Sequence, residues 1–327
     1  MPAPAPHPAP EAVVALDGVV RRFGAQTALD GLSFTVPART IMVLLGPNGA
    51  GKTTCTRMIT GALDPDDGSV RVFGRDPAIE GAEVRRRIGI VSAKPALYDR
   101  LSGLDNLRYA AELYGLGRGD DARRRIGEAA ERFGITRALG QQVGGYSTGM
   151  KTRLALARSV LHDPDLVLYD EPTSGLDPES SYAVLELIRE MTDEGDTVVM
   201  CTHLLLEAEG LADQVVMLQD GRSLVQGPPG ELVRRYWPEH TVLVEAEDPG
   251  AVARLAGEPG VQDVRVDGAG PVVVVVDDPA RTPDLVFALA RHRVRVTRVE
   301  VERHSLEDLY FAVRRSSGEN PIGEVHP

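Results

Sequence analysis

Short apolar runs, each bounded by glycine or polar residues, recur through the first two thirds of the chain. They are typical of buried β-strands, and they occupy residues 41–45, 88–91, 166–169, 197–201 and 214–218. Between the second and third runs the apolar positions follow a helical period over residues 102–158, for example at Leu104, Leu107 and Ala111. The pattern therefore predicts an α/β core with a helical subdomain inserted between strands.

Two further regions flank this core. Residues 12–24 and 32–36 predict an N-terminal antiparallel β region of two strands around a turn, and residues 69–73 predict another strand. Beyond Tyr236-Trp237-Pro238 the predicted order becomes strand, helix, strand, strand, helix, strand, which indicates a small α+β domain of ferredoxin-like type. We expect these elements at 241–247, 251–256, 261–266, 271–276, 283–291 and 294–302, with a last helix at 305–314.

These changes of pattern divide the chain. We expect a disordered Pro/Ala tail over residues 1–10, a main domain over 11–235 with its helical subdomain at about 94–160, an accessory domain over 238–315 and a tail over 316–327. The length of 327 residues agrees with one large and one small domain. The accessory region carries no motif that we can connect to chemistry, so we interpret it as a structural or interaction module.

Composition restricts the classes of function. The net charge of −12 disfavours a nucleic-acid partner. The two cysteines, Cys55 and Cys201, fall in predicted buried elements, which suits a reducing cytoplasm and argues against a disulfide framework. No apolar run approaches the roughly 18 residues of a membrane span, and the N-terminus lacks the pattern of a signal peptide. Any membrane role would therefore require a separate membrane partner.

The apolar run 41–45 leads into a phosphate-binding loop. Eight residues fit G-x-x-x-x-G-K-[ST], the Walker A motif: Gly46, Pro47, Asn48, Gly49, Ala50, Gly51, Lys52 and Thr53. Glycines let the backbone N–H groups turn inward, and the following helix, which includes Thr54, adds its positive N-terminal dipole. Lys52 is one of only three lysines among 36 basic residues, and it would reach the β- and γ-phosphates while Thr53 binds Mg²⁺. This pattern predicts a nucleoside triphosphate site.

A second apolar run, 166–169, ends in two acids as a Walker B strand does. Asp170 is placed to hold Mg²⁺, directly or through water, and Glu171 to polarise the attacking water. An Asp-Glu pair after an apolar strand is weak evidence alone, because it is also typical of a solvated turn. The Walker A loop upstream favours the catalytic interpretation.

Residues 146–150, Tyr-Ser-Thr-Gly-Met, lie shortly before the Walker B strand, and here the chain resembles the ATP-binding subunits of ABC transporters. In that family a Leu-Ser-Gly-Gly signature opens a helix that faces the γ-phosphate. Here Tyr146 and Thr148 depart from that form, whereas Ser147 and Gly149 match it. The resemblance spans about residues 11–235 and implies a role in ATP binding for Ser147, Thr148 and Gly149.

Three further positions match family motifs. Asp177 ends a Ser-Gly-Leu-Asp segment that resembles the D-loop, which links two nucleotide sites across a dimer. His203 matches the switch histidine that contacts the γ-phosphate, and Phe23 matches the aromatic residue that stacks on adenine. The Tyr-Ser-Thr-Gly-Met-Lys form and a C-terminal segment, Ser-Leu-Glu-Asp-Leu-Tyr-Phe at 305–311, resemble the drug-resistance and sodium-export (ABC-2) subunits.

The resemblance also implies the cofactors, partners, catalytic residues and location of the protein. ATP and Mg²⁺ would be the cofactors, a second copy arranged head to tail would complete each site, and Glu171 and His203 would be catalytic. Energy from hydrolysis would power export through a separate permease, so the chain would be cytoplasmic and peripheral on the inner face of the cell membrane. One position departs from the family: where a glutamine usually touches Mg²⁺ or the attacking water, residue 93 is alanine. We therefore expect altered Mg²⁺ dependence or altered coupling to the permease.

Two other functions stay open at this point. A soluble ABC protein of translation would carry two cassettes, but the chain has one P-loop and one signature, and a DNA-repair type would need a long coiled coil that does not fit between residues 53 and 146. A regulatory module that holds ATP without turnover finds support only in Ala93. The transported substrate cannot be read from this chain, because in the family the permease selects it.

Overall fold

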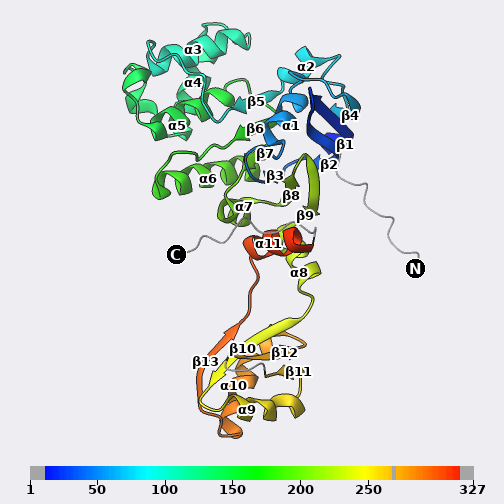
Figure 1. The fold of residues 1–327 in the computed structure, drawn as a ribbon. Coiled ribbons are helices and arrows are strands. Elements are labelled where there is room, and N and C mark those ends of the chain that lie inside the picture. Colours follow the sequence, from blue (N-terminus) through cyan, green and yellow to red (C-terminus); the bar gives the residue numbers. More distant parts are fainter. Residues whose placement is uncertain (1–11, 267–269, 317–327) are drawn as a thin grey trace, which may run out of the picture. The chain divides into compact units, whose positions relative to one another are not determined.

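The computed structural model describes residues 12–266 and 270–316 (Figure 1). The chain divides into two compact units, Met1–Pro229 and Gly230–Pro327, and each is described by itself. The predicted tails at 1–10 and 316–327 lie outside the described residues except for Ser316, which ends a helix. Across the described ranges, no helix combines the length and the apolar character that a membrane span would require.

A six-stranded sheet forms the centre of the first unit. Its strand order is β5-β6-β7-β3-β8-β9, parallel except for the edge strand β9. The strands are β3 (Ile41–Leu45), β5 (Ile88–Val91), β6 (Leu166–Asp170), β7 (Thr197–Thr202), β8 (Gln214–Gln219) and β9 (Arg222–Gly227). Every residue of β3, β6 and β7 is buried, as expected of parallel strands covered on both faces. The five predicted core strands are confirmed.

A three-stranded antiparallel sheet, in the order β2-β1-β4, packs beside the first. It consists of β1 (Ala12–Phe23), β2 (Gln26–Pro37) and β4 (Asp67–Val72). The predicted start of the second strand, residue 32, was wrong by six positions. The ladder continues through Gly31, whose φ of 73° accommodates an irregularity between the pairs Val19–Leu32 and Arg21–Leu29.

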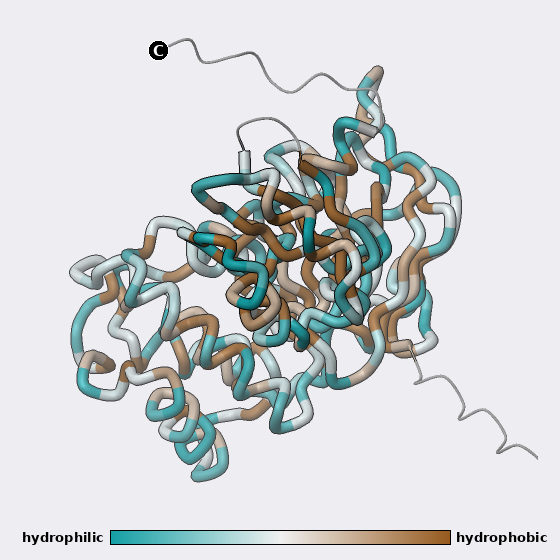
Figure 2. The backbone as a smooth tube through the Cα atoms, turned by 90° about the horizontal axis from the view of Figure 1, so that it is seen from below, coloured by the Kyte–Doolittle hydropathy of each residue, from teal (hydrophilic) through white to brown (hydrophobic). Residues whose placement is uncertain are grey.

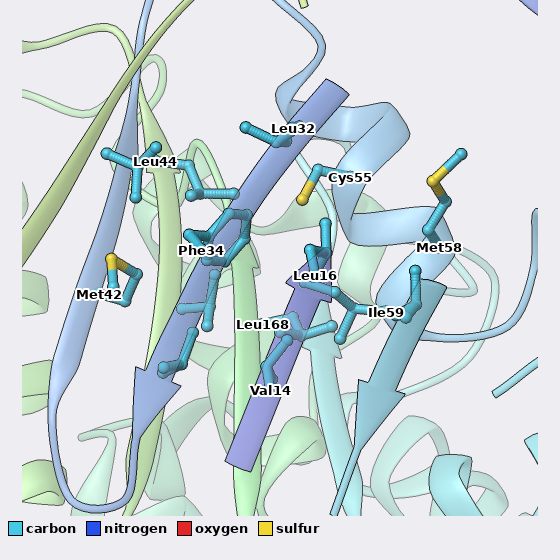
Figure 3. Close-up of a cluster of buried hydrophobic side chains, with 14 of the residues drawn as sticks. Val14, Leu16, Leu32, Phe34, Met42, Leu44, Cys55, Met58, Ile59 and Leu168 are labelled. Carbon is cyan, nitrogen blue, oxygen red and sulfur yellow. The ribbon is translucent and has the colours of Figure 1, made fainter. Parts of the chain in front are cut away.

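One apolar core joins this sheet to the central one (Figure 3). Leu16 and Phe34 from the antiparallel sheet meet Met58 of helix α1 (Lys52–Ile59) and Leu44 and Leu168 of the central strands. The phosphate-loop helix is therefore clamped between two sheets, which fixes the position of its N-terminus. Hydrophobic and hydrophilic stretches alternate along the backbone, and the buried strands are rich in hydrophobic residues (Figure 2).

Both cysteines belong to this region and are free. Cys55 lies on α1 and Cys201 on β7, and both are fully buried. Burial raises the pKa of Cys201 to about 12 and raises that of Cys55 as well. The two thiols are therefore neutral packing groups, in agreement with the expected absence of a disulfide framework.

The remaining helices of the first unit fall into two groups. Around the sheets lie α2 (Gly81–Arg85), α6 (Pro178–Asp193) and α7 (Leu205–Leu211). The predicted helical subdomain is formed by α3 (Gly103–Leu113), α4 (Asp120–Arg132) and α5 (Thr148–Ser159), with 3-10 turns at Thr136–Ala138 and Val143–Gly145. Side-chain N-caps begin two of these helices, because Ser102 accepts a hydrogen bond from Asp105 N and Ser147 accepts one from Met150 N. The three helices contact one another, and each buries an apolar residue: Leu107, Ile126 and Leu154.

The second unit contains a four-stranded antiparallel sheet in the order β11-β12-β10-β13. Its elements are β10 (His240–Ala246), α9 (Pro249–Val252) continued by a 3-10 turn (Ala253–Gly257), β11 (Val261–Arg265), β12 (Val272–Val276), a 3-10 turn (Pro279–Arg281), α10 (Thr282–Arg291) and β13 (Val296–Val301). Helices α8 (Pro229–Tyr236) and α11 (Leu306–Ser316) precede and follow them.

The central pair of this sheet is formed by the first and third strands of the unit, and the fourth lies beside the first. This order confirms the predicted ferredoxin-like topology. The predicted core role of the valine run is also confirmed, because Val272, Val274 and Val276 are buried in the core of the unit.

Candidate nucleotide-binding and catalytic site

The phosphate loop connects the end of β3 to the start of α1. At two positions of the loop there is no room for a side chain, so only glycine fits. A Cβ atom on Gly46 would lie 2.3 Å from the Leu218 carbonyl oxygen, and one on Gly51 would lie 2.7 Å from the Ala28 carbonyl oxygen. Gly51 also has a φ of 106°, which L side chains rarely adopt. The loop therefore packs closely on its neighbours and turns its backbone directly into the helix.

Lys52 bends back over this loop. Its side chain is buried, and the ammonium group donates to the carbonyl oxygens of Gly46 at 2.6 Å and Pro47 at 3.2 Å. The same Nζ lies 3.5 Å from Oε1 of Glu171. A buried ammonium group held over this loop is suited to bind phosphate oxygens.

Thr53 and Asp170 place two oxygen atoms beside this loop. The Thr53 hydroxyl donates to Oδ2 of Asp170 at 3.1 Å. Burial raises the pKa of Asp170, while the hydrogen bond from Thr53 acts in the opposite direction. Hard oxygen ligands on one carboxylate and one hydroxyl fit Mg²⁺, which is usually held by one or two carboxylates plus substrate phosphates. This mode of binding does not need three protein carboxylates or imidazoles. No group of three His, Cys, Asp or Glu side chains that could hold a metal occurs within residues 12–266 and 270–316.

Glu171 turns sharply away from the end of β6. Its backbone adopts a left-handed conformation with a φ of 53°, which is uncommon for a residue other than glycine. Its Oε2 lies 2.8 Å from Nδ1 of His203, and its backbone N–H donates to the Cys201 carbonyl oxygen. The carboxylate therefore lies between the Lys52 ammonium group and the His203 imidazole.

These side chains surround one cavity of about 370 Å³. It is lined by Phe23, Gln26, Ala28, Pro47, Asn48, Gly49, Gly51, Lys52, Thr53, Thr54, Ala93, Asp170 and Glu171. The sequence did not predict Gln26 and Ala28 as lining residues. They lie at the cavity because the β1–β2 hairpin pairs Phe23 with Gln26. Ala93 faces the cavity with a methyl group where the family pattern has an amide.

Phe23 stands at the rim of the cavity with 46% of its surface exposed. This exposure leaves a ring face for stacking. The Arg21 guanidinium carbon lies 5.0 Å from the ring centroid, which supports one side of the ring.

A larger cavity of about 630 Å³ lies between α3 and α4. Three arginines line it, Arg108, Arg118 and Arg123, but each is paired with a carboxylate from the same region. This cavity therefore offers no unpaired positive charge for a nucleotide, and size alone does not identify the site.

The remaining predicted residues lie away from the Walker cavity. Ser147 caps α5, while Asp177 caps α6 by accepting from Ser180 N at 3.0 Å. A Cβ atom on Gly149 would lie 3.7 Å from Ser180 Oγ, so the starts of the two helices are neighbours. The Ser180 hydroxyl lowers the pKa of Asp177 by donating to its carboxylate. Within one chain this pair of helix N-termini therefore lies apart from the Walker cavity.

Comparison with known proteins identifies the family of the chain. The profile of the ABC transporter family matches residues 29–174, and that of the C-terminal domain of DrrA1-3-like ATP-binding proteins matches residues 227–313. The daunorubicin/doxorubicin resistance ATP-binding protein DrrA of Streptomyces peucetius is 34% identical over 93% of this chain and 93% of its own length. The Nod factor export ATP-binding protein I of Ralstonia nicotianae is 32% identical over 94% of this chain and 92% of its own length.

A solved ATP-binding subunit of an ABC transporter has a TM-score of 0.63 and 30% identity, over 69% of this chain and 93% of that structure. The fold and the cavity define a P-loop ATPase of the ABC type with an added ferredoxin-like domain. The chain belongs to the ATP-binding subunits of ABC transporters, in the group of drug-resistance and export proteins. This membership favours the transport function over a soluble role in translation or repair.

Proposed function

We propose that the Walker cavity hydrolyses ATP through Glu171 and that this reaction powers export through a separate membrane permease. The observation that carries the proposal is the position of the Glu171 carboxylate, 3.5 Å from Lys52 Nζ and 2.8 Å from His203 Nδ1. A carboxylate held between a phosphate-binding cation and an imidazole is suited to orient a water molecule at the γ-phosphate.

Each side chain then has a defined role toward ATP. The loop from Gly46 to Thr53, with Thr54, binds the phosphates through backbone N–H groups, and Phe23 stacks on adenine. Lys52 exchanges its carbonyl partners for phosphate oxygens as the nucleotide enters. His203 holds Glu171 in place and contacts the γ-phosphate. Thr53 and Asp170 would hold Mg²⁺, which supplies neutralisation of phosphate charge when bound.

A second copy of the chain completes each site in this proposal. Ser147, Thr148 and Gly149 begin a helix whose N-terminus lies outside the cavity of its own chain, and Asp177 lies beside it. Two chains related head to tail would place these N-terminal dipoles on the phosphates held by the partner. Such an arrangement explains why the family signature is present although it lines no part of its own cavity.

The permease would bind a separate groove of the helical subdomain. This groove, of about 360 Å³, lies between the end of β5 and helices α3 and α5. Tyr98 and Leu113 border it with 50% and 69% of their surfaces exposed, and Tyr109 and Tyr114 contribute further aromatic surface. An exposed aromatic groove lined by Ser92 and Ala96, on either side of Ala93 in the chain, is suited to receive a protein segment. The chain would then sit on the inner face of the cell membrane.

Replacement of Glu171 by glutamine tests the catalytic proposal. The amide keeps the size of the side chain but cannot accept a proton from water. We expect Glu171→Gln to bind ATP with unchanged affinity, to release phosphate at least about a hundredfold more slowly, and to form a stable dimer with ATP by light scattering. Phosphate release at the wild-type rate would contradict the proposal for Glu171, and a persistent monomer would contradict the two-copy site.

A further inference from the structure

Besides the direct contact between Glu171 and His203, a second carboxylate connects the two segments that carry these proposed catalytic residues. Glu207 lies in the first turn of α7, and its Oε2 accepts a hydrogen bond from the Thr173 hydroxyl at 2.9 Å. The Thr202 hydroxyl lies 3.4 Å from the same oxygen. Thr173 follows Glu171 by two residues, and Thr202 directly precedes His203. One oxygen atom therefore receives a hydroxyl from each catalytic loop.

Both hydroxyl donors are inaccessible to water. Thr202 is fully buried and Thr173 is 3% exposed. A buried hydroxyl without a hydrogen-bond partner costs free energy. Each threonine hydroxyl therefore depends on the Glu207 carboxylate as its acceptor. The Thr202 hydroxyl also accepts from Leu204 N at 3.1 Å, which fixes the backbone on the far side of His203. The connection is thus continuous from Glu171 through Glu207 to His203.

The loop from Glu171 to Asp177 has few other restraints toward β7. The Glu171 backbone N–H donates to Cys201, and the next bonds, Ser174 N to Glu171 O and Leu176 N to Thr173 O, stay within the loop. Apart from the direct contact of Glu171 with His203, Thr173 supplies the side-chain hydrogen bond that ties this loop toward the segment carrying His203. Burial raises the pKa of Glu207, and the hydrogen bonds from the two threonines oppose that rise.

We propose that Glu207 is a positioning residue for ATP hydrolysis, which holds the Glu171 loop and the His203 loop in register through Thr173 and Thr202. This inference rests on the proposed function of Glu171. A carboxylate in the first turn of a helix can instead stabilise the helix through its dipole alone. That role needs neither threonine, and the two roles give different results on mutation.

The test compares five variants of the full chain, four single and one double, by steady-state phosphate release and thermal unfolding. Glu207→Ala removes the acceptor, and Glu207→Gln retains an amide oxygen that can accept from both hydroxyls. Thr173→Val removes one donor while keeping the shape of the side chain. Glu209→Ala is the matched control, because Glu209 is an exposed carboxylate on the same helix with no hydrogen bond or ion pair among the described residues.

We expect Glu207→Ala to lower kcat by about tenfold or more with little change in the KM for ATP, since misplaced groups slow the reaction while the phosphate loop is intact. Glu207→Gln should recover most of this loss, and Thr173→Val should lower kcat in the same way. Combining Thr173→Val with Glu207→Ala should add little to Glu207→Ala alone, as expected for residues that act through one contact. Glu209→Ala should match the wild type.

Loss of thermal stability in Glu207→Ala with kcat equal to that of Glu209→Ala would overturn the proposal and leave only the helix-dipole role. Additive effects of Thr173→Val and Glu207→Ala would overturn it as well. If Glu207→Ala does not fold, Thr173→Val alone decides, because an unchanged kcat in that variant contradicts the connection. Failure of the proposed function is distinguishable, because it would appear as full activity in Glu171→Gln.

Discussion

Substitution of Gly149 by glutamine tests the proposed role of the α5 N-terminus without changing the Walker cavity. A Cβ atom at this position has its nearest neighbour at 3.7 Å, an ordinary van der Waals distance, and the backbone has no left-handed φ. The variant should therefore fold. A glycine-to-glutamine change within α5 should leave the free energy of unfolding unchanged or raise it by up to about 1 kcal/mol. The Walker cavity is not touched, so the affinity of the monomer for ATP should be unaltered.

The ATPase activity of Gly149→Gln should nevertheless be lost. The new side chain would occupy the space at the helix N-terminus where the partner's γ-phosphate is proposed to bind. Loss of one preorganised N–H donor group costs about 10²–10³ in rate, so we expect a fall of at least about a hundredfold. Phosphate release, ATP binding and thermal unfolding would be measured on the same preparation.

Gly127 provides the matched control. It lies on the exposed side of α4 in the same subdomain, and a Cβ atom there would have no neighbour within 4 Å. Gly127→Gln should fold and hydrolyse ATP like the wild type. Wild-type ATPase activity in a folded Gly149→Gln protein would refute the reasoning, and so would an equal loss of activity in both variants.

Three further predictions concern the cavity and the core. Because burial raises the pKa of Asp170 above its ordinary value of 3.8, stability from its neutral form is present at acid pH and lost as the pH rises through the folded-state pKa. Asp170→Asn should therefore raise the Tm of the nucleotide-free protein at neutral pH, with a gain that vanishes toward acid pH, while abolishing Mg²⁺-dependent hydrolysis; an unchanged Tm at neutral pH would contradict this. Ala93→Gln should lower the Mg²⁺ concentration for half-maximal ATPase activity, whereas Ala93→Leu should not, and equal behaviour of the two would rule out a role for the amide. Leu168→Ala, in the core of Figure 3, should lower the free energy of unfolding by about 2–5 kcal/mol in urea titration, and a loss below 1 kcal/mol would argue against that packing.

The sequence predicts the central elements well because their signals are local. Runs such as 41–45 and 166–169 are apolar at every position since both faces of the sheet are covered, and glycines mark the turn from β3 into α1. The start of β2 was misplaced because Gly31 resembles a turn residue, and only pairing with β1 shows that the strand continues through it.

The parts of the site that escaped prediction depend on contacts between distant segments. Gln26 and Ala28 reach the cavity through strand pairing, and they carry no motif. Glu207 reaches Thr173 across 34 positions because β6 and β7 are neighbours, which no local pattern of residues reveals. The separation of Ser147 and Asp177 from the Walker cavity is also a property of the fold that no local pattern of residues shows, although the family resemblance already implied a second copy at each site.

The most direct test of a site shared between two chains is to mix two inactive variants. Glu171→Gln retains its helix N-termini, and Gly149→Gln retains its Walker cavity. In a mixed dimer one site would combine the intact half of each chain. We predict that phosphate release, near zero for each variant alone, rises on mixing before ATP is added toward about a quarter of the wild-type rate, because random pairing places half the chains in mixed dimers with one intact site. No gain on mixing would contradict the composite site.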